Sequence, residues 1–398
     1  MKKINLIYLL CLCLYNLNAQ NSNDIVIGKI EEIYSKILNE QRRVLVYVPE
    51  HNPYDKNTYP VVYLLDGDAH FYSVVSMIQQ LSSVNGNTIC PKMIVVGISN
   101  TDRTRDLTPT KGKYENSGGG DHFISFVEKE LIPHIESNYP TKPYRTFIGH
   151  SLGGLTVINT LLHKPNLFNA YVAIDPSMWW NNKNLLNKLK TSTFNDTHAK
   201  KTLFLGIANT MHKDMDTISV QKDTTSKTRH IRAILELNSY LNKASQNKIS
   251  FKSKYYENDD HGSVPLIAEY DALHYIFNFY RFKLNDEDYT NPEIDILAKV
   301  ENYYNGLSKG FGIEMKPEEQ YVNNLGLKLL SKKQFKKAEQ TFELNIKNYP
   351  ENSTVYESLG DFYLAIENRK KAIKNYKKSV SLNNDSFLKN KIIKLEKK

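Results

Sequence analysis

The stretch "YRTFIGHSLGGLTVINTLL", residues 144–162, decides the fold of this chain. A short β-rich run at 146–148 is followed by "GHSLG" and then by an apolar, helix-like run. Gly149 and Gly153 permit a tight turn and a close approach of strand and helix, which would hold the Ser151 hydroxyl at the edge of a sheet. A glycine-rich turn with an incidental serine is the alternative, but the strand and helix on either side favour a nucleophile.

Strand-like and helix-like runs alternate between Asn21 and about Leu284. Several strand-like runs are almost continuously apolar, which is typical of strands buried on both faces. This alternation predicts an α/β domain with a mostly parallel central sheet. The expected strands are 44–48, 61–65, 93–98, 146–148, 171–174, 202–207 and 249–255, and the expected helices are 121–137, 152–163, 228–244 and 264–282.

The region after Leu284 differs in character, because a helix expected near 294–304 leads into an internal repeat with a period of 34 residues. This period, with its small residues and a following aromatic, resembles tetratricopeptide repeats, in which small residues lie where paired helices approach closely. Two repeats and a final helix at 387–395 are few for an independent solenoid, so we expect this all-α tail to pack on the preceding helix or domain. The repeated residues are Gly326, Ala338, Phe342 and Pro350, which recur as Gly360, Ala372, Tyr376 and Asn384.

The sequence predicts four segments. Residues 1–20 have the pattern of an export signal, with two lysines, a short apolar run and a small residue at the expected cleavage site. Residues 21–285 are the expected α/β domain, 286–320 a helical linker and 321–398 the repeats. We expect no membrane span, because the apolar runs are too short. An exported protein with a single cysteine beyond the signal, Cys90, is expected in the periplasm, at the cell surface or secreted in a Gram-negative bacterium.

The basic charge of the chain lies in the tail. Residues 321–398 hold 17 Lys or Arg against 8 Asp or Glu, which accounts for the net charge of +9. These lysines are spread over many helix positions without aromatic interleaving, so a solvated basic face is expected and nucleic acid is not an expected partner. The repeats are expected to bind a peptide or another protein, or to shield the edge of the α/β domain.

A serine at its ordinary pKa is a weak nucleophile, and it needs a base within hydrogen-bonding reach. His261, in "YYENDDHGSVP", follows the last expected strand, where the base lies when the chain order is serine, acid, histidine. His274 falls within a helix-like run and is expected to pack. The other late histidines, His198, His212 and His230, precede the last strand.

The carboxylate that would orient this imidazole is left open. The loop after the preceding strand offers Asp214, with Asp216 nearby, while Glu257 lies four residues before His261. The two aspartates directly before His261 are expected to be solvated loop charges. Glu257 and Asp214 rank nearly equal, and some serine hydrolases function with a weaker partner.

Negative charge that develops on a substrate oxygen needs preorganised donors. The N–H of Leu152, directly after the serine, is one expected donor. The turn after "VVYLLDGDAH" offers the second, the N–H of Asp68, because Gly67 frees the backbone there. For the side chains of Asp66 and Asp68, a structural role is an at least equally strong expectation.

These residues lie in stretches that resemble the "putative esterase" family of α/β-hydrolases. That family includes esterase D-like enzymes, the ferric-siderophore trilactone esterases and, more distantly, the antigen 85 mycolyltransferases. The matching stretches, among them "YPVVYLLDGDAHF", "RTFIGHSLGGL", "DPSMWW" and "ENDDHGSVP", follow one order from 44 to 282. The resemblance implies an α/β-hydrolase three-layer sandwich with Ser151 as nucleophile, His261 as base and the Asp68 and Leu152 amides as oxyanion hole. It implies no cofactor and no metal.

Trp179 and Trp180 are candidates for substrate binding. They follow a strand end on the same rim as Ser151, where exposed indoles would form a flat apolar wall. Core packing is an equally strong alternative. The family resemblance implies a place for the pair next to the substrate cleft.

Arg103 and Arg105 are the other candidates for substrate binding, because they follow the end of the expected 93–98 strand. Their guanidinium groups could hold an anionic substrate in a bidentate manner. A structural pair of Arg105 with Asp102 or Asp106 is favoured, since most loop charges are structural or solvated.

The hypothesis from the sequence is an exported serine hydrolase that cleaves carboxylic esters through an acyl-enzyme. Its substrate would be a small-molecule or glycan ester, either a siderophore lactone or an acyl, feruloyl or acetyl ester. Two alternatives stay open: acyl transfer of the antigen 85 type, and a non-catalytic protein-interaction module built on the repeats.

Overall fold

The computed structural model describes residues 24–50, 57–244 and 248–397. Its strands are β1 (Lys29–Ser35), β2 (Glu40–Tyr47), β3 (Tyr59–Leu64), β4 (Ile94–Ile98), β5 (Thr141–His150), β6 (Ala170–Ile174), β7 (Thr202–Ala208) and β8 (Ser250–Tyr256). Within the described residues they form one sheet in the order β1-β2-β4-β3-β5-β6-β7-β8. β2 pairs antiparallel with β1 and with β4, while all other neighbouring strands are parallel.

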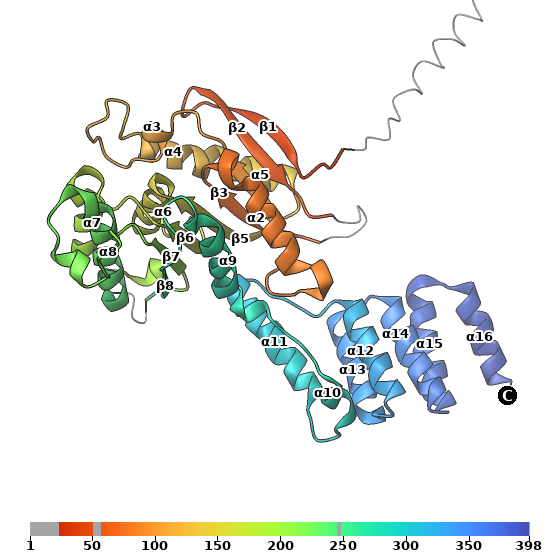
Figure 1. Ribbon diagram of the computed structural model, residues 1–398. Helices are drawn as coiled ribbons and strands as arrows, with labels where there is room; N and C mark the ends of the chain where they lie inside the picture. The colour runs from red at the N-terminus through yellow and green to blue at the C-terminus, as the bar shows by residue number, and fades with distance from the viewer. Residues whose placement is uncertain (1–23, 51–56, 245–247, 398) are drawn as a thin grey trace, which may run out of the picture.

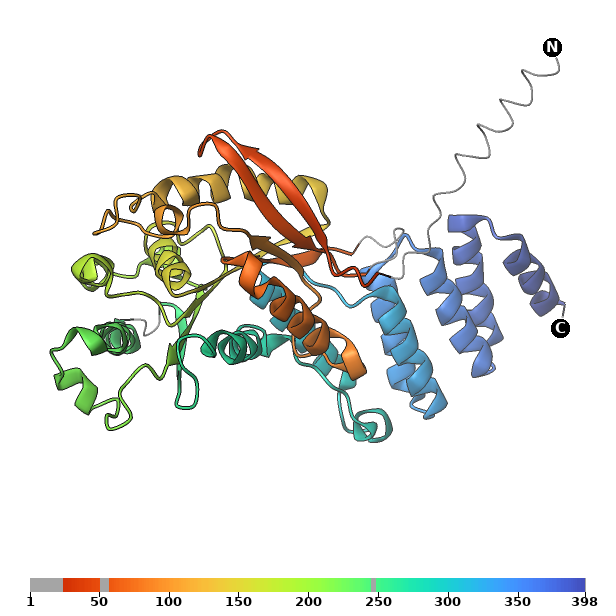
Figure 2. The same ribbon diagram turned by 45° about the horizontal axis from the view of Figure 1, so that its top comes forward.

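Helices cover both faces of this sheet (Figures 1 and 2). They are α2 (Gly67–Ser82), α3 (Arg103–Asp106), α4 (Gly120–Phe126), α5 (Ile132–Asn138), α6 (Leu152–His163), α7 (Trp180–Thr191), α8 (Arg229–Ala244) and α9 (Val264–Ile276). Side chains of α4 to α8 share one hydrophobic core with the sheet, and those of α2 and α9 share a second. Alternate residues of one strand, such as Val61 and Val62, belong to different cores, so the cores lie on opposite faces. The result is the predicted three-layer α/β arrangement.

Four elements of this part were not predicted from the sequence, namely β1, α2, the short helix α3 and α7. β1 alternates between exposed and partly buried residues at the edge of the sheet, so its sequence lacks an apolar run. α2 begins directly after β3 at Asp66, whose φ of 54° and glycine neighbour are typical of a turn. α7 contains a run of left-handed residues, 181–183, within an asparagine-rich stretch that favours loops. The helix expected at 121–137 is present but is interrupted by a π-helical turn, Val127–Leu131.

The region after the α/β domain is entirely helical among its described elements. These are α10 (Asp286–Thr290), α11 (Ile296–Phe311), α12 (Glu319–Ser331), α13 (Phe335–Asn348), α14 (Ser353–Ala365), α15 (Arg369–Asn383) and α16 (Ser386–Glu396). α12 packs on α13, and α14 packs on α15, as two successive hairpins (Figure 1). A Cβ on Gly326 would lie 2.7 Å from the Phe342 ring, and one on Gly360 would lie 2.5 Å from the Tyr376 ring. The same contact between a small and an aromatic residue therefore recurs in both units of the 34-residue repeat.

The helix α11 connects the repeats to the α/β domain. Its Leu307 and Phe311 are buried in the core that α2 and α9 share. Its Ile296 and Val300 are buried in the core of the repeats. The tail thus packs on the preceding helix, as expected. The predicted export signal, residues 1–20, lies outside the described residues, and within them no helix is both long and apolar enough to cross a bilayer.

Candidate active site

Ser151 stands at a sharp turn between β5 and α6. Its backbone angles, φ 59° and ψ −113°, lie in a region that residues with a side chain rarely adopt. A Cβ on Gly149 would lie 2.5 Å from the backbone of Gly153, so glycine is required for this approach of strand and helix. The turn presents the Ser151 hydroxyl at the carboxyl edge of the sheet.

His261 follows β8 and meets the serine at this edge. Its Nε2 is 3.1 Å from the Oγ of Ser151, although 110 residues separate the two in the chain. Its side chain is 41% exposed, so a substrate and water can reach it. The structure therefore brings together the two groups that the sequence selected as nucleophile and base.

The carboxylate on the other side of this imidazole is Asp175, a residue outside the predicted set. Its Oδ2 accepts the Nδ1–H of His261 at 2.6 Å, and its Oδ1 accepts the N–H of Ala208 at 3.0 Å. Because a carboxylate only accepts, Nδ1 of His261 carries the proton and Nε2 is free to accept the proton of Ser151. The side chain of Asp175 is fully buried at the end of β6.

The prediction that Asp214 or Glu257 orients the imidazole is therefore wrong. Asp214 lies 3.1 Å from His212 and its side chain is 72% exposed. Glu257 is exposed after β8, and its backbone carbonyl accepts the side-chain amide of Asn209. Asp175 follows β6, which is the neighbour of β5 in the sheet, whereas Asp214 follows β7 and Glu257 follows β8. The available signal was "AYVAIDPS", in which Asp175 ends an apolar strand.

Burial and hydrogen bonding act in opposite directions on Asp175. Burial, the largest influence, would raise its pKa, but hydrogen bonds from His230 and His261 outweigh burial and hold the pKa well below its ordinary value. The carboxylate is therefore ionised at neutral pH and can stabilise a positive charge on His261. The adjacent His150, whose ring centroid is 4.4 Å from that of His261, has its pKa lowered to about 4, mainly by burial, and stays neutral.

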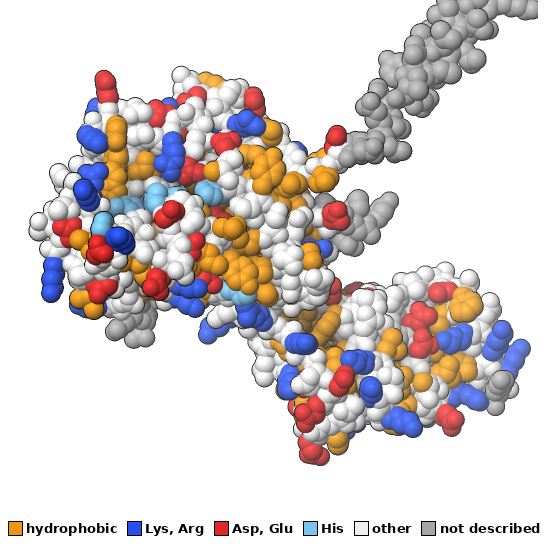
Figure 3. All heavy atoms as spheres, viewed as in Figure 1, with side chains coloured by type: hydrophobic (Ala, Val, Ile, Leu, Met, Phe, Trp, Pro, Cys, Tyr) orange, Lys and Arg blue, Asp and Glu red, His pale blue; other side chains and the backbone are white. Residues whose placement is uncertain are grey.

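A second histidine binds the same carboxylate oxygen. His230, in the first turn of α8, donates its Nε2–H to Oδ2 of Asp175 at 2.7 Å. Its ring centroid lies 5.0 Å from that of His261, and the two rings are perpendicular. Figure 3 shows several histidine side chains close together on this face of the molecule. His230 was set aside at the sequence level because it precedes the last strand, yet α8 begins beside the strand ends.

We expect His230 to hold Asp175 in place. His230→Ala should lower kcat for ester hydrolysis by about tenfold with little change in KM, because one of the charge-assisted hydrogen bonds that fix the carboxylate is lost. His230→Gln should recover part of the rate, since its amide can donate to the same oxygen. Steady-state kinetics of both variants check this, and equal rates for the two would contradict it.

The turn after β3 lies beside the first turn of α6, as an oxyanion hole requires. A Cβ on Gly153 would lie 3.4 Å from Oδ2 of Asp66. The side chain of Asp68 accepts hydrogen bonds from Ser99 Oγ at 2.9 Å and from the Asn100 N–H at 3.1 Å, which is the structural role expected for it. The backbone N–H groups of Asp68 and Leu152 belong to the first turns of α2 and α6, where no carbonyl of the same helix accepts them.

Arg103 and Arg105 are held in structural ion pairs, and the pair of Arg105 with Asp106 is one that the sequence favours over substrate binding. The Nε of Arg103 donates to Oδ1 of Asp66 at 2.6 Å. The guanidinium of Arg105 binds Glu40 at 2.6 Å and Asp106 at 2.7 Å. Carboxylates of the fold therefore occupy some of the guanidinium donors of both residues.

The tryptophan pair is divided between core and cleft. Trp180 is buried and donates its Nε1–H to the carbonyl of Thr110 at 3.0 Å. Trp179 is partly buried, and the guanidinium of Arg229 lies 4.2 Å from the centroid of its ring. A cavity of about 190 Å³ lies at these residues, with Lys113 in its lining. Ser151 is not part of this lining, but Trp179 follows two residues after Ser177, whose Oγ is 3.3 Å from the Oγ of Ser151.

Asp175, His230 and His261 also form a group with the composition of a metal site. Within the described part of the chain, their potential ligand atoms all lie within 4.8 Å of one another. The two hydrogen bonds to Asp175 already use these atoms. The closeness of these three side chains is therefore explained by the two hydrogen bonds with which Asp175 orients the imidazoles.

Glu269 on α9 is a buried carboxyl group that lies close to His70. It is 1% exposed, and its nearest ionisable neighbour is His70, whose Nδ1 is 3.9 Å from Oε1. Burial raises the pKa of Glu269 to about 8 from its ordinary value of 4.5. The folded protein thus keeps a proton that the unfolded chain releases, so this contribution to stability is complete below pH 4.5 and declines as the pH rises to about 8.

Glu269→Gln should remove this pH dependence, because glutamine is a neutral group of the same shape. Relative to wild type, the variant should gain about 3 kcal/mol in the free energy of unfolding between pH 5 and pH 8. Urea denaturation of both proteins across this pH range measures the difference in their free energies of unfolding. Contributions of other titrating groups are common to both proteins and cancel in this difference. A difference that stays constant with pH would contradict the prediction.

The fold and the arrangement of Ser151, His261 and Asp175 define an α/β-hydrolase. The chain belongs to the esterase family, since the family model described as "Putative esterase" matches residues 35–274.

Individual relatives agree with this assignment. The chain is 31% identical over 191 residues to the ferri-bacillibactin esterase BesA of Bacillus subtilis, a match that spans 43% of this chain and 66% of that protein. It is 29% identical over 234 residues to the siderophore enterobactin esterase of Emericella nidulans, spanning 51% and 77% of the two chains.

Solved structures give the same result. An IroE-like serine hydrolase from Shewanella oneidensis aligns with a TM-score of 0.65 and 31% identity, over 80% of this chain and 98% of that one. A protein from Capnocytophaga ochracea shares the fold over 93% of this chain and 100% of that one, with a TM-score of 0.64 and 20% identity. From its family and these relatives, the protein is a carboxylic-ester hydrolase.

Proposed function

We propose that this protein is an exported serine esterase that hydrolyses the ester bonds of siderophores through an acyl-enzyme. The observation that carries the proposal is the continuous hydrogen-bonded contact from Ser151 to His261 to Asp175. The names of the relatives, esterases of ferri-bacillibactin and enterobactin, support the choice of substrate.

In the first half of the reaction, Oγ of Ser151 attacks the ester carbonyl carbon while its proton passes to Nε2 of His261. Asp175 stabilises the imidazolium that forms. The N–H groups of Leu152 and Asp68 donate hydrogen bonds to the carbonyl oxygen as it becomes negative. The tetrahedral intermediate then expels the alcohol, which takes the proton from His261, and the acyl group stays on Ser151.

Water completes the cycle at the same groups. His261 removes a proton from a water molecule, whose oxygen attacks the acyl carbon. The carboxylic acid leaves as Ser151 recovers a proton from His261. The exposure of the imidazole, 41%, leaves this water a path to the acyl-enzyme.

The cavity at Trp179 and Trp180 favours a substrate with aromatic and anionic groups. Trp179 supplies an aromatic face, and Arg229 and Lys113 supply two positive charges, while no carboxylate belongs to the lining among the described residues. A catecholate siderophore combines planar rings with negative charge. Such a group could stack on the indole and pair with the guanidinium.

The substrate and the nucleophile are tested together. A fluorophosphonate probe should label Ser151, and catecholate trilactones should be cleaved with a higher kcat/KM than p-nitrophenyl acetate. Trp179→Ala and Arg229→Gln should each raise KM for the trilactone by about tenfold and leave p-nitrophenyl acetate hydrolysis unchanged. Lys243→Gln, at the other end of α8, is the matched control. Absence of labelling in folded protein would refute the mechanism, and new ester formed with an added alcohol in preference to free acid would indicate acyl transfer.

Export rests on the first residues of the chain, where Lys2 and Lys3 precede a short apolar run that ends before Ala19. When the complete sequence is expressed in a Gram-negative host, the protein should be recovered from the periplasm or the medium, and it should be shortened at its N-terminus. A variant that lacks residues 2–20 should stay in the cytoplasm. Retention of the full-length, unprocessed chain in the cytoplasm would contradict export.

A further inference from the structure

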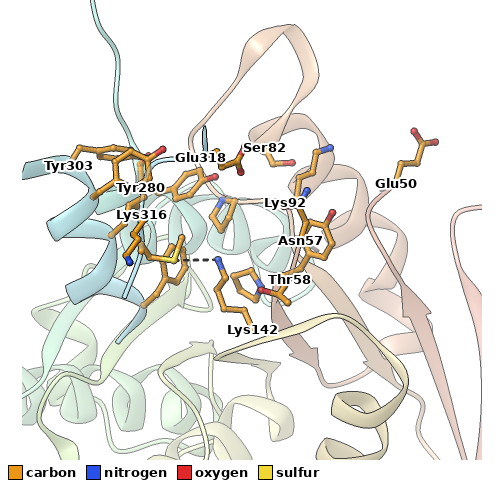
Figure 4. A pocket seen from close by; sticks show the side chains of 17 residues that line it. Glu50, Asn57, Thr58, Ser82, Lys92, Lys142, Tyr280, Tyr303, Lys316 and Glu318 are labelled. Carbon is orange, nitrogen blue, oxygen red and sulfur yellow. Dashed lines mark hydrogen bonds between the residues drawn. The ribbon is translucent and has the colours of Figure 1, made fainter. Parts of the chain in front are cut away.

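A cavity lies at the edge of the sheet opposite the active site, between the α/β domain and α11 (Figure 4). Its volume is about 540 Å³. Lys142, in its lining, stands at the start of β5, whereas Ser151 follows the end of the same strand. The extended strand between them places the two residues about 30 Å apart. No group in this cavity takes part in the proposed reaction.

Lys142 extends its ammonium group into this cavity (Figure 4). Its Nζ is 3.7 Å from Sδ of Met315 and 5.0 Å from the centroid of the Phe311 ring. Burial lowers the pKa of Lys142, and the charge of the exposed Glu318 opposes this only as a smaller influence. Within the described ranges no carboxylate forms an ion pair with Lys142. A charge partly removed from water, with a thioether and an aromatic ring as its contacts, favours the binding of an anion.

The same lining holds further hydrogen-bond donors and further positive charge. Figure 4 shows Tyr280 across the cavity from Lys142, with its hydroxyl turned toward the cavity. Burial raises the pKa of Tyr280, so its phenol stays protonated and can donate. Lys92 and Lys316 lie in the lining with exposed side chains. The lysines of the lining outnumber its carboxylates, Glu50 and Glu318.

Part of the remaining wall is apolar, and Asn57, Thr58 and Ser82 add polar groups to it. A single half-buried ammonium and a phenol match the two oxygens of a carboxylate, whereas phosphate sites usually supply several N–H donors. The apolar walls suit a ligand whose anionic group is attached to an aromatic or aliphatic body. The apolar lining comprises Pro60, Pro91, Leu307, Phe311 and Met315.

We propose that this cavity binds a small organic carboxylate, with the carboxylate on Lys142 and Tyr280 and the apolar body against Phe311 and Leu307. The walls come from strand starts of the α/β domain and from α11. A ligand bound there therefore contacts both parts and holds α11 against the domain.

Binding is tested with benzoate and benzamide, which have the same shape but differ in charge. In ligand-observed NMR titrations of the full chain, benzoate should bind with a Kd on the order of 1 mM, and benzamide at least about tenfold more weakly. Lys142→Met should weaken benzoate binding by about tenfold or more, and Tyr280→Phe by a few-fold, about threefold. Lys129→Met, at an exposed position, removes the same charge elsewhere and should leave the Kd unchanged.

Three results would overturn the proposal. Equal affinity for benzamide would remove the role of the ammonium, and tighter binding of inorganic phosphate would exclude carboxylate as the preferred class. Loss of benzoate binding in Trp179→Ala, but not in Lys142→Met, would place the ligand at the active site. Thermal melting of each variant establishes that it is folded, and hydrolysis of p-nitrophenyl acetate by Lys142→Met should equal that of wild type.

Discussion

Ser151→Ala should lower kcat for p-nitrophenyl acetate by about 10⁵- to 10⁶-fold, because the hydroxyl that His261 activates for attack on the ester carbonyl is removed. The residual rate would come from the oxyanion donors and from binding. Stopped or continuous assays of p-nitrophenol release measure this over a long incubation. The melting temperature should not fall, since the hydroxyl is part of a strained turn rather than of the core.

A neighbouring hydroxyl provides the control for this prediction. The Oγ of Ser177 lies 3.3 Å from the Oγ of Ser151. Among the described residues His261 has its hydrogen bonds with Ser151 and Asp175 and not with Ser177, so Ser177 lacks a base. Ser177→Ala should therefore lower kcat by no more than about tenfold. A fall as large as that of Ser151→Ala, or substantial activity left in Ser151→Ala, would contradict the assignment of the nucleophile.

Asp175→Asn should lower kcat by about 10³- to 10⁴-fold. The amide of asparagine would present a donor to Nδ1 of His261, and this favours the tautomer in which Nε2 carries the proton and cannot accept the one from Ser151. The ionised carboxylate that stabilises the imidazolium is lost as well. KM should change little, because the side chain of Asp175 is buried away from the substrate. Near-UV circular dichroism of the variant checks that the buried site keeps its packing.

Glu257→Gln and Asp214→Asn are the matched controls, because each removes one carboxylate charge at an exposed position after a neighbouring strand. Both variants should keep kcat within about twofold of wild type. A large loss in either variant, with Asp175→Asn active, would restore the assignment made from the sequence.

Local sequence was sufficient for the parts of this protein whose geometry is set by neighbouring residues. The spacing of Gly149 and Gly153 around Ser151 predicts the strand–turn–helix, and a side chain at Gly149 would collide with the backbone of Gly153 across the turn. The 34-residue period predicts the helical hairpins for a similar reason. Gly326 and Gly360 each lie against the aromatic residue of their own unit, Phe342 and Tyr376.

The position of His261 could be predicted from the sequence because it depends on one general property of the fold. The carboxyl ends of parallel strands meet at one edge, so a histidine after the last strand lies near a serine after an earlier one. The choice of the carboxylate that binds His261 could not be made from this property. Asp214, Glu257 and Asp175 all follow strands, and only the packing of side chains separates them.

The sequence by itself determined the layered α/β domain, the turn that carries Ser151, the place of His261 and the helical repeats, because these follow from periodicity and from contacts between residues close in the chain. The tertiary structure alone decided that Asp175 binds both His261 and His230, and that Lys142 faces a cavity against α11. These contacts join residues 55, 86 and 173 positions apart, as the Asp175–His230, Asp175–His261 and Lys142–Met315 pairs show. Which distant groups meet depends on strand order and on where each helix begins in space, and no local pattern records either.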